Sequence, residues 1–139
     1  MGITFTVPGD VVGKGRARAV RRGKFISHYT PTKTVNYENL VKMAASDAMG
    51  DNLLFQKAVK LDLLILVTPP ASWSNKKRMA ALQGQIYPTT KPDVDNVLKA
   101  ICDACNGVVF EDDKQVVHCS AIKKYSEKSG AVVMIGELL

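Results

Sequence analysis

The sequence predicts a single small α+β domain, residues 1–139, in which a mixed β-sheet packs against about three helices in an α/β sandwich-like arrangement. The 139 residues suffice for one domain with a real core and are too few for two. The composition, 46% apolar and 23% charged, argues against a disordered, collagenous or coiled-coil chain. Strand and helix patterns follow one another without a regular βαβ order, which disfavours a doubly wound fold.

The N-terminal part predicts a strand and then a basic segment. Apolar residues alternate with threonine over residues 3–7, the period of a half-buried strand, and Pro8 ends it. Residues 14–24 hold six bases and no acid, which is typical of an exposed, mobile loop or a hairpin. The six bases are Lys14, Arg16, Arg18, Arg21, Arg22 and Lys24. A short strand is expected at residues 25–27.

The central part predicts a helix, a buried strand and a second, shorter helix. Residues 34–49 show one apolar stripe, with Thr34 as N-cap and Gly50 as stop. The stripe consists of Tyr37, Leu40, Val41, Ala44 and Ala48. Residues 58–68 alternate and then become continuously apolar, as in a strand that is covered on both faces. A short helix is then expected between Ser74, its N-cap, and Gly84.

The C-terminal part predicts a third helix and two strands. Asp93 to Asn96 has the chemistry of a helix start, and an apolar face continues as far as Cys105. Strands are expected at residues 115–125 and 131–135, separated by a turn.

The net charge of +6 is unevenly distributed. Residues 93–113 carry six acids and one base, a sum of −5, whereas the rest of the chain carries 18 bases and seven acids, or +11. A basic body attracts polyanions such as nucleic acid, and an acidic cluster within it repels them unless a cation is bound there.

The acidic segment predicts a site for a hard metal ion. Asp93 and Asp95 converge at a helix start, and a helix of about ten residues spans only ~15 Å, so the chain can bring Asp112 and Asp113 back toward them. Mg²⁺ or Mn²⁺ prefers oxygen ligands and would remove the repulsion between these carboxylates. Lys99 and Asp103 continue a polar stripe from Asp95 on the same helical face.

Structural interpretations of the same residues remain open. Acids at a helix N-terminus complement its dipole, and an acidic turn is commonly just solvated. A zinc site is suggested by Cys102 and Cys105, with His118 and Cys119 further on. Both helical cysteines fit the apolar face of the helix, however, so packing in the core is the favoured interpretation. Trp73 and Tyr87 could stack on bases or pack in the protein. No Gly-rich phosphate loop or dinucleotide fingerprint is visible, so no nucleotide cofactor is expected.

Three blocks of sequence closely resemble the signature of the RusA family of Holliday-junction resolvases, which is frequent in phages and prophages. The blocks are Lys91-Pro92-Asp93-Val94-Asp95-Asn96-Val97-Leu98-Lys99-Ala100, then Asp103-Ala104 with Asn106-Gly107, and Phe110-Glu111-Asp112-Asp113-Lys114-Gln115-Val116. Looser similarity includes Lys14-Gly15-Arg16, Thr30-Pro31 and Ser72-Trp73-Ser74.

The resemblance implies an endodeoxyribonuclease that resolves Holliday junctions in DNA recombination and repair with Mg²⁺ or Mn²⁺. It implies that Asp93, Asp95 and Asp113 are metal-binding and catalytic, that Asp112 lies beside them, and that Lys99 is the functional lysine. It also implies a homodimer, which symmetric cutting of a four-way DNA junction independently requires, because two equivalent cuts need two sites related by a two-fold axis.

The basic residues are the expected DNA contacts, because phosphates dominate such binding. These are the six bases of residues 14–24 together with Lys76, Lys77 and Arg78. Two alternatives remain: a basic DNA-binding protein without catalysis, and a nuclease for other branched DNA such as flaps. The longest apolar run, residues 63–67, is too short to span a bilayer, so we expect no membrane contact and a cytoplasmic protein.

Overall fold

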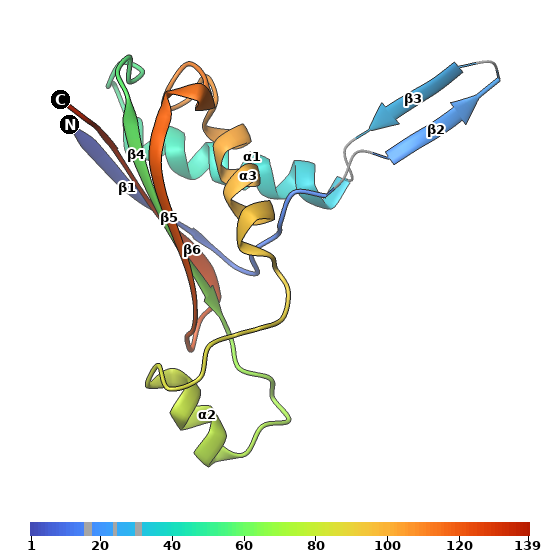
Figure 1. Ribbon diagram of the computed structural model, residues 1–139, viewed down its shortest axis with the longest axis vertical. Coiled ribbons are helices and arrows are strands. Elements are labelled where there is room, and N and C mark those ends of the chain that lie inside the picture. The colour runs from blue at the N-terminus through green and yellow to red at the C-terminus, as the bar shows by residue number, and fades with distance from the viewer. Residues whose placement is uncertain (16–17, 24, 30–31) are drawn as a thin grey trace.

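A four-stranded mixed sheet forms the centre of the protein (Figure 1). The computed structural model describes residues 1–15, 18–23, 25–29 and 32–139. The strands of the sheet lie in the order β1-β6-β4-β5, and only the β4–β5 pair is parallel. Their bounds are β1 Gly2–Pro8, β4 Val59–Val67, β5 Val116–Tyr125 and β6 Gly130–Glu137. The mixed sheet and the α+β class are therefore as the sequence predicts.

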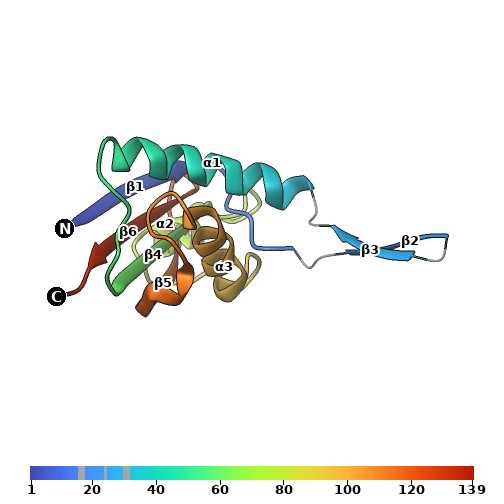
Figure 2. The same ribbon diagram turned by 90° about the horizontal axis from the view of Figure 1, so that it is seen from above.

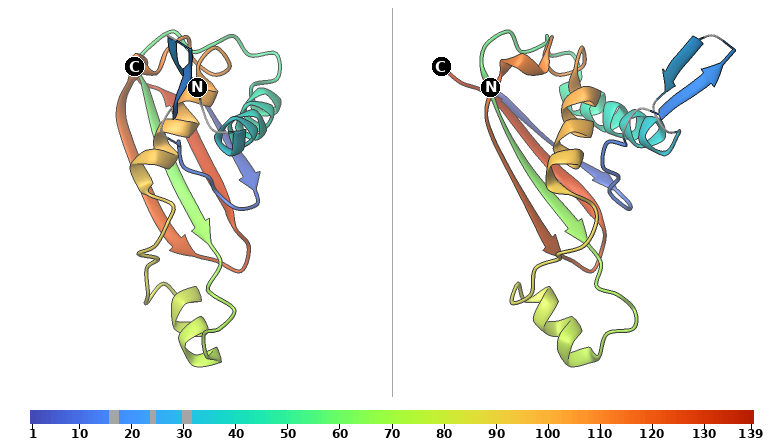
Figure 3. Two further views of the ribbon diagram at one scale, coloured as in Figure 1. Left: turned by 90° about the vertical axis from the view of Figure 1, so that its right-hand side faces the viewer. Right: turned by 45° about the vertical axis from the view of Figure 1, so that its right-hand side comes forward.

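Helices α1, Thr32–Met49, and α3, Val94–Cys105, cover one face of this sheet (Figures 2 and 3). Side chains alternate between the two faces of a strand, so every second residue of β1 and β4 points toward these helices. These side chains are buried. The core also contains Phe55 and Phe110, whose backbones form a bridge beside the sheet. Among the described residues, no helix is both long enough and apolar enough to cross a bilayer.

Helix α2, Asn75–Leu82, lies beyond the end of the sheet (Figure 1). Ser74 is its N-cap, as predicted, and its hydroxyl accepts a hydrogen bond from the Lys77 amide at 3.2 Å. The Trp73 ring packs edge-on against Tyr125 with centroids 5.3 Å apart, and the Lys77 ammonium lies 4.0 Å from the Trp73 ring centroid. These contacts give Trp73 the packing role that the sequence left open beside base stacking.

Helix α1 differs from the prediction in its start and in its stripe. It begins at Thr32, so Thr34 is a helical residue, not the N-cap, and it is 2% exposed. The buried positions are Thr34, Tyr37, Val41, Ala45 and Met49, while Leu40 is 52% exposed. The predicted Ala44 and Ala48 are half-buried, because the face that α1 turns toward β1 and α3 is centred one residue further along the helix, on Ala45 and Met49.

The basic segment contains a hairpin that projects from the body (Figure 1). Strand β2, Arg18–Arg22, pairs antiparallel with β3, Phe25–Tyr29, and Gly23 has the positive φ of 59° that a tight turn requires. Of the two expectations for this segment, loop or hairpin, the structure gives the hairpin. The bounds of strand β2 were not predicted, because its arginines interrupt the alternation of apolar and polar residues that marks a half-buried strand.

Candidate functional site

Helix α3 presents a buried apolar face and a polar stripe. The apolar face is completely buried and consists of Val97, Ala100, Ile101, Ala104 and Cys105. The stripe consists of Asp95, Lys99 and Asp103 at steps of four residues. Because the apolar face fixes the rotation of the helix about its axis, the stripe is held at the surface along its whole length.

Asp93 and Asp95 lie together at the start of α3, and both are exposed. The Asn96 side-chain amide donates to Asp93 Oδ2 at 3.4 Å, and the Asn96 backbone amide donates to Asp95 Oδ1 at 3.0 Å. The preceding loop is held from β5, since Lys123 Nζ donates to the carbonyl oxygens of Thr90 and Pro92 at 2.6 and 3.0 Å. Lys123 of strand β5 thus holds in place the loop that leads to Asp93 and Asp95.

Asp112 and Asp113 form a second acidic pair in the turn before β5. Asp112 Oδ1 accepts from the Lys114 amide at 2.9 Å, and Gln115 Oε1 accepts from the Asp112 amide at 3.1 Å, which is a capping box around a 3₁₀ turn, Asp113–Gln115. The Gln115 amide nitrogen donates to the carbonyl oxygens of Phe55 and Lys57 at 2.8 and 3.0 Å. Gln115 therefore clamps the acidic turn to the segment that leads into β4.

The acidic turn lies beside the second half of α3, whereas Asp93 and Asp95 lie at the start of this helix. In the described part of the chain, no three acidic, cysteine or histidine side chains are grouped so that they could hold one metal ion. The predicted metal site formed by both acidic pairs therefore stays a prediction.

The environment of Asp113 raises its pKa above the ordinary value. Burial is the main cause, the Asp112 and Asp103 carboxylates add to it, and the Lys99 ammonium opposes it. Backbone donation from Lys114 instead lowers the pKa of Asp112. Asp113 thus shares its surroundings with Asp103 and Lys99 of the stripe, which makes the second half of α3 the place where these charges meet.

The donor chemistry of the first pair fits a magnesium or manganese ion. Mg²⁺ is commonly bound by one or two protein carboxylates together with water and substrate phosphates. Asp93 and Asp95 offer two exposed carboxylates two residues apart. The predicted ligand set of Asp93, Asp95, Asp112 and Asp113 stays a prediction, and its first two members lie together at the start of α3.

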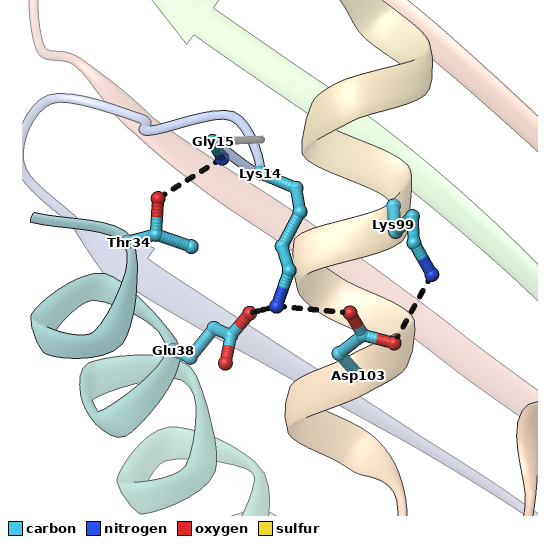
Figure 4. A network of polar contacts seen from close by, with 6 residues as sticks. All are labelled: Lys14, Gly15, Thr34, Glu38, Lys99 and Asp103. Atoms are coloured by element: carbon cyan, nitrogen blue, oxygen red, sulfur yellow. Dashed lines mark hydrogen bonds and ion pairs between the residues drawn. The ribbon is translucent and has the colours of Figure 1, made fainter. Parts of the chain in front are cut away.

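Lys14 occupies a position that the sequence did not predict (Figure 4). Its Nζ lies 2.7 Å from Glu38 Oε1 on α1 and 3.2 Å from Asp103 Oδ2 on α3, and its side chain is 22% exposed. Burial alone lowers the pKa of Lys14, but hydrogen bonds and charges from both carboxylates outweigh it and the pKa is raised. Lys14 thus joins α1 to α3 in this structure, and its predicted contact with DNA stays a prediction.

The other predicted DNA contacts lie on two projecting elements. Arg18, Arg21 and Arg22 belong to β2, and the exposed Arg21 donates to the Gly23 carbonyl at 3.4 Å. Arg16 and Lys24 lie outside the described residues, as do the side chains of Arg18 and Arg22. On α2, Lys76 is exposed, Lys77 covers Trp73, and Arg78 Nη1 donates to the Pro69 carbonyl at 3.5 Å.

Comparison with known proteins agrees with the resemblance in the sequence. The family model described as endodeoxyribonuclease RusA matches residues 8–136. The chain belongs to the RusA endodeoxyribonuclease family. It is also 38% identical over 139 residues to the uncharacterized protein YqaN of Bacillus subtilis (strain 168), a match that covers 98% of this chain and 96% of that protein. The match to the RusA family includes α3, the acidic turn and the segment around Lys14.

Two of the three cysteines of this RusA family member, Cys102 and Cys105, pack in or against the core. Burial raises the pKa of the Cys102 thiol to about 11 and that of Cys105 to about 12, which keeps both protonated at neutral pH. Zinc binds deprotonated cysteines, and the raised pKa values of Cys102 and Cys105 disfavour that form. The third cysteine, Cys119, is exposed on β5. The structure therefore favours packing, not zinc binding, as the role of Cys102 and Cys105.

Four positioning residues were missed by the sequence analysis: Thr34, Glu38, Gln115 and Lys123. For Gln115 a signal existed, because Asp112 and Gln115 have the spacing of a capping box. Thr34 accepts a hydrogen bond from the Gly15 amide at 3.0 Å, and Glu38 lies one turn further along α1. Their partners are more than 15 residues distant in the chain, so no local pattern indicates them.

Replacing Lys14 by methionine should destabilise the protein by about 1–3 kcal/mol, because Glu38 and Asp103 would face each other as partly buried charges without a partner. Lys99→Met is the matched control: Lys99 pairs with the same Asp103 at 3.6 Å, but its side chain is 62% exposed. An exposed pair contributes less than about 1 kcal/mol. Urea unfolding measures both variants, and equal effects would contradict a structural role for Lys14.

Proposed function

We propose that this chain is a metal-dependent, structure-selective endonuclease that resolves Holliday junctions by paired symmetric nicks during DNA recombination and repair. The observation that carries the proposal is the family match over residues 8–136, which spans every residue of the candidate site. The proposal places the enzyme in the cytoplasm, where it would meet branched DNA.

Asp93 and Asp95 are the proposed catalytic metal ligands. Both are exposed, so a phosphodiester can reach them, and Asn96 and Lys123 fix their position. Mg²⁺ or Mn²⁺ bound there would activate water and stabilise the charge that develops on the phosphate. Lys99, one turn further along α3, is the proposed phosphate contact or leaving-group stabiliser, since its side chain is 62% exposed and, among the described residues, forms an ion pair only with Asp103, at 3.6 Å.

Asp113 is also a proposed catalytic residue and metal ligand, with Asp112 beside it. It lies near the second half of α3, where the charges of Asp103 and Lys99 act on it.

The projecting hairpin and α2 are the proposed DNA arms. They leave the body at different places (Figure 1), and each carries basic residues. A four-way junction is a wide ligand, and phosphate contacts position DNA without specifying its sequence. Two basic arms at a distance suit this task better than one compact basic patch.

The enzyme is proposed to act as a homodimer, because paired nicks need two sites related by a two-fold axis. Sedimentation equilibrium should therefore give twice the mass of the chain. Mixed dimers of wild-type and Asp95→Asn chains should nick a plasmid cruciform once and produce open circles, whereas wild-type dimers should produce linear plasmid. Linear product from purified mixed dimers would contradict one site per chain.

Asp95→Asn should abolish cleavage of a synthetic four-way junction in Mg²⁺ while junction binding survives. The amide keeps the shape of the side chain but removes the charge that attracts the cation. Asp10→Asn is the matched control, since Asp10 is an exposed acid of the loop after β1 and outside the site. Its rate should equal that of the wild type. Cleavage by Asp95→Asn at the normal rate would show that the site is assigned to the wrong residue.

A further inference from the structure

A cavity of about 320 Å³ lies beside the acidic pair, between the N-terminal segment and the start of α3. Its walls come from three parts of the chain: residues 11–14, the first turn of α1 and the loop before α3. The volume is about ten times the ~30 Å³ that a water molecule occupies in the liquid. The cavity is therefore large enough for a phosphate group with part of its sugar.

The charges in this cavity are those of a site for an anion. Its lysines are Lys14, Lys33 and Lys91, and its one acid is Asp93. Lys14 is already balanced by Glu38 and Asp103. Lys33 and Lys91 are exposed, and neither forms an ion pair within the described residues. They come from α1 and from the loop before α3, so two different elements contribute a lysine to the cavity wall.

The wall beside α3 depends on Gly13. A Cβ atom at this position would lie 2.9 Å from Asn96 Cβ, closer than such carbons approach in proteins. The Lys14 amide donates to the Asn96 carbonyl at 2.8 Å, which holds residues 11–14 against the helix. The absence of a side chain at Gly13 therefore keeps the cavity wall tight against the residues that follow Asp93 and Asp95.

We propose that this cavity binds a phosphodiester of the DNA backbone next to the one that is cut, with Lys33 and Lys91 as its cationic contacts. The inference rests on the proposed nuclease function. It assigns to Lys33 and Lys91, which were not among the predicted DNA contacts, the positioning of DNA at the acidic pair. Because Asp93 lies in the cavity wall, a phosphate held there places its neighbour along the strand at the carboxylates.

The test measures binding of a four-way junction in EDTA as a function of salt concentration. Each lysine that contacts phosphate contributes about one to the slope of log affinity against log salt. Lys33→Gln/Lys91→Gln should lower this slope by about one to two and weaken binding about tenfold or more at moderate salt. Lys42→Gln/Lys57→Gln is the matched control: it removes two exposed lysines outside the cavity and should leave the slope unchanged.

The outcomes separate this inference from the function on which it rests. If the wild type does not bind the junction, the proposed function fails. If the wild type binds and both double variants behave alike, the cavity is not a phosphate site, although the nuclease assignment stands. Gly13→Ala provides a second test without a change of charge: it should weaken binding with a smaller loss of slope, and unchanged binding would contradict the cavity geometry.

Discussion

The ammonium group of Lys14 connects the three parts of the protein on which the site depends. It lies between Glu38 of α1 and Asp103 of α3, and its own segment leads into the basic hairpin (Figure 4). The Glu38 and Asp103 carboxylates, 2.7 and 3.2 Å from this ammonium group, would repel each other without it. The cation between them therefore favours the close packing of α1 and α3 at this point. The same contact fixes the root of the hairpin, together with the hydrogen bond from the Gly15 amide to Thr34.

The ion pair between Lys14 and Asp103 also bears on the net charge of −5 over residues 93–113. The acidic window of −5 is partly balanced inside the protein, because Lys14 and Lys99 both pair with Asp103. Asp93 and Asp95 at one end of α3 have no such cationic partner among the described residues, which leaves their charge available to a metal ion. Helix α3 thus carries two exposed carboxylates at its start, and in its second half a carboxylate, Asp103, that is balanced by two lysines.

Local patterns predicted most of the fold and part of the site. The strands follow from alternation, and α3 follows from an apolar face that ends at Asn106 and Gly107. The pairing of Lys14 with Glu38 and Asp103 spans 24 and 89 residues, so it depends on how α1 and α3 pack and leaves no trace in a local pattern. The predicted convergence of Asp113 with Asp95 stays a prediction, and the contact that holds the acidic turn, from Gln115 to the backbone of Phe55 and Lys57, spans 60 and 58 residues and is likewise absent from any local pattern.

The most direct test of the nuclease assignment uses a four-way junction, a flap and a linear duplex of the same sequence. Each is incubated with the purified protein in Mg²⁺ or in EDTA, and the nicks are mapped on both strands. If the protein is a metal-dependent junction resolvase, we expect symmetric nicks in the junction with Mg²⁺ and none with EDTA. Binding that weakens with salt but gives no nicks with either would contradict it and indicate a DNA-binding protein without catalysis. Nicks confined to the flap would contradict the proposed substrate.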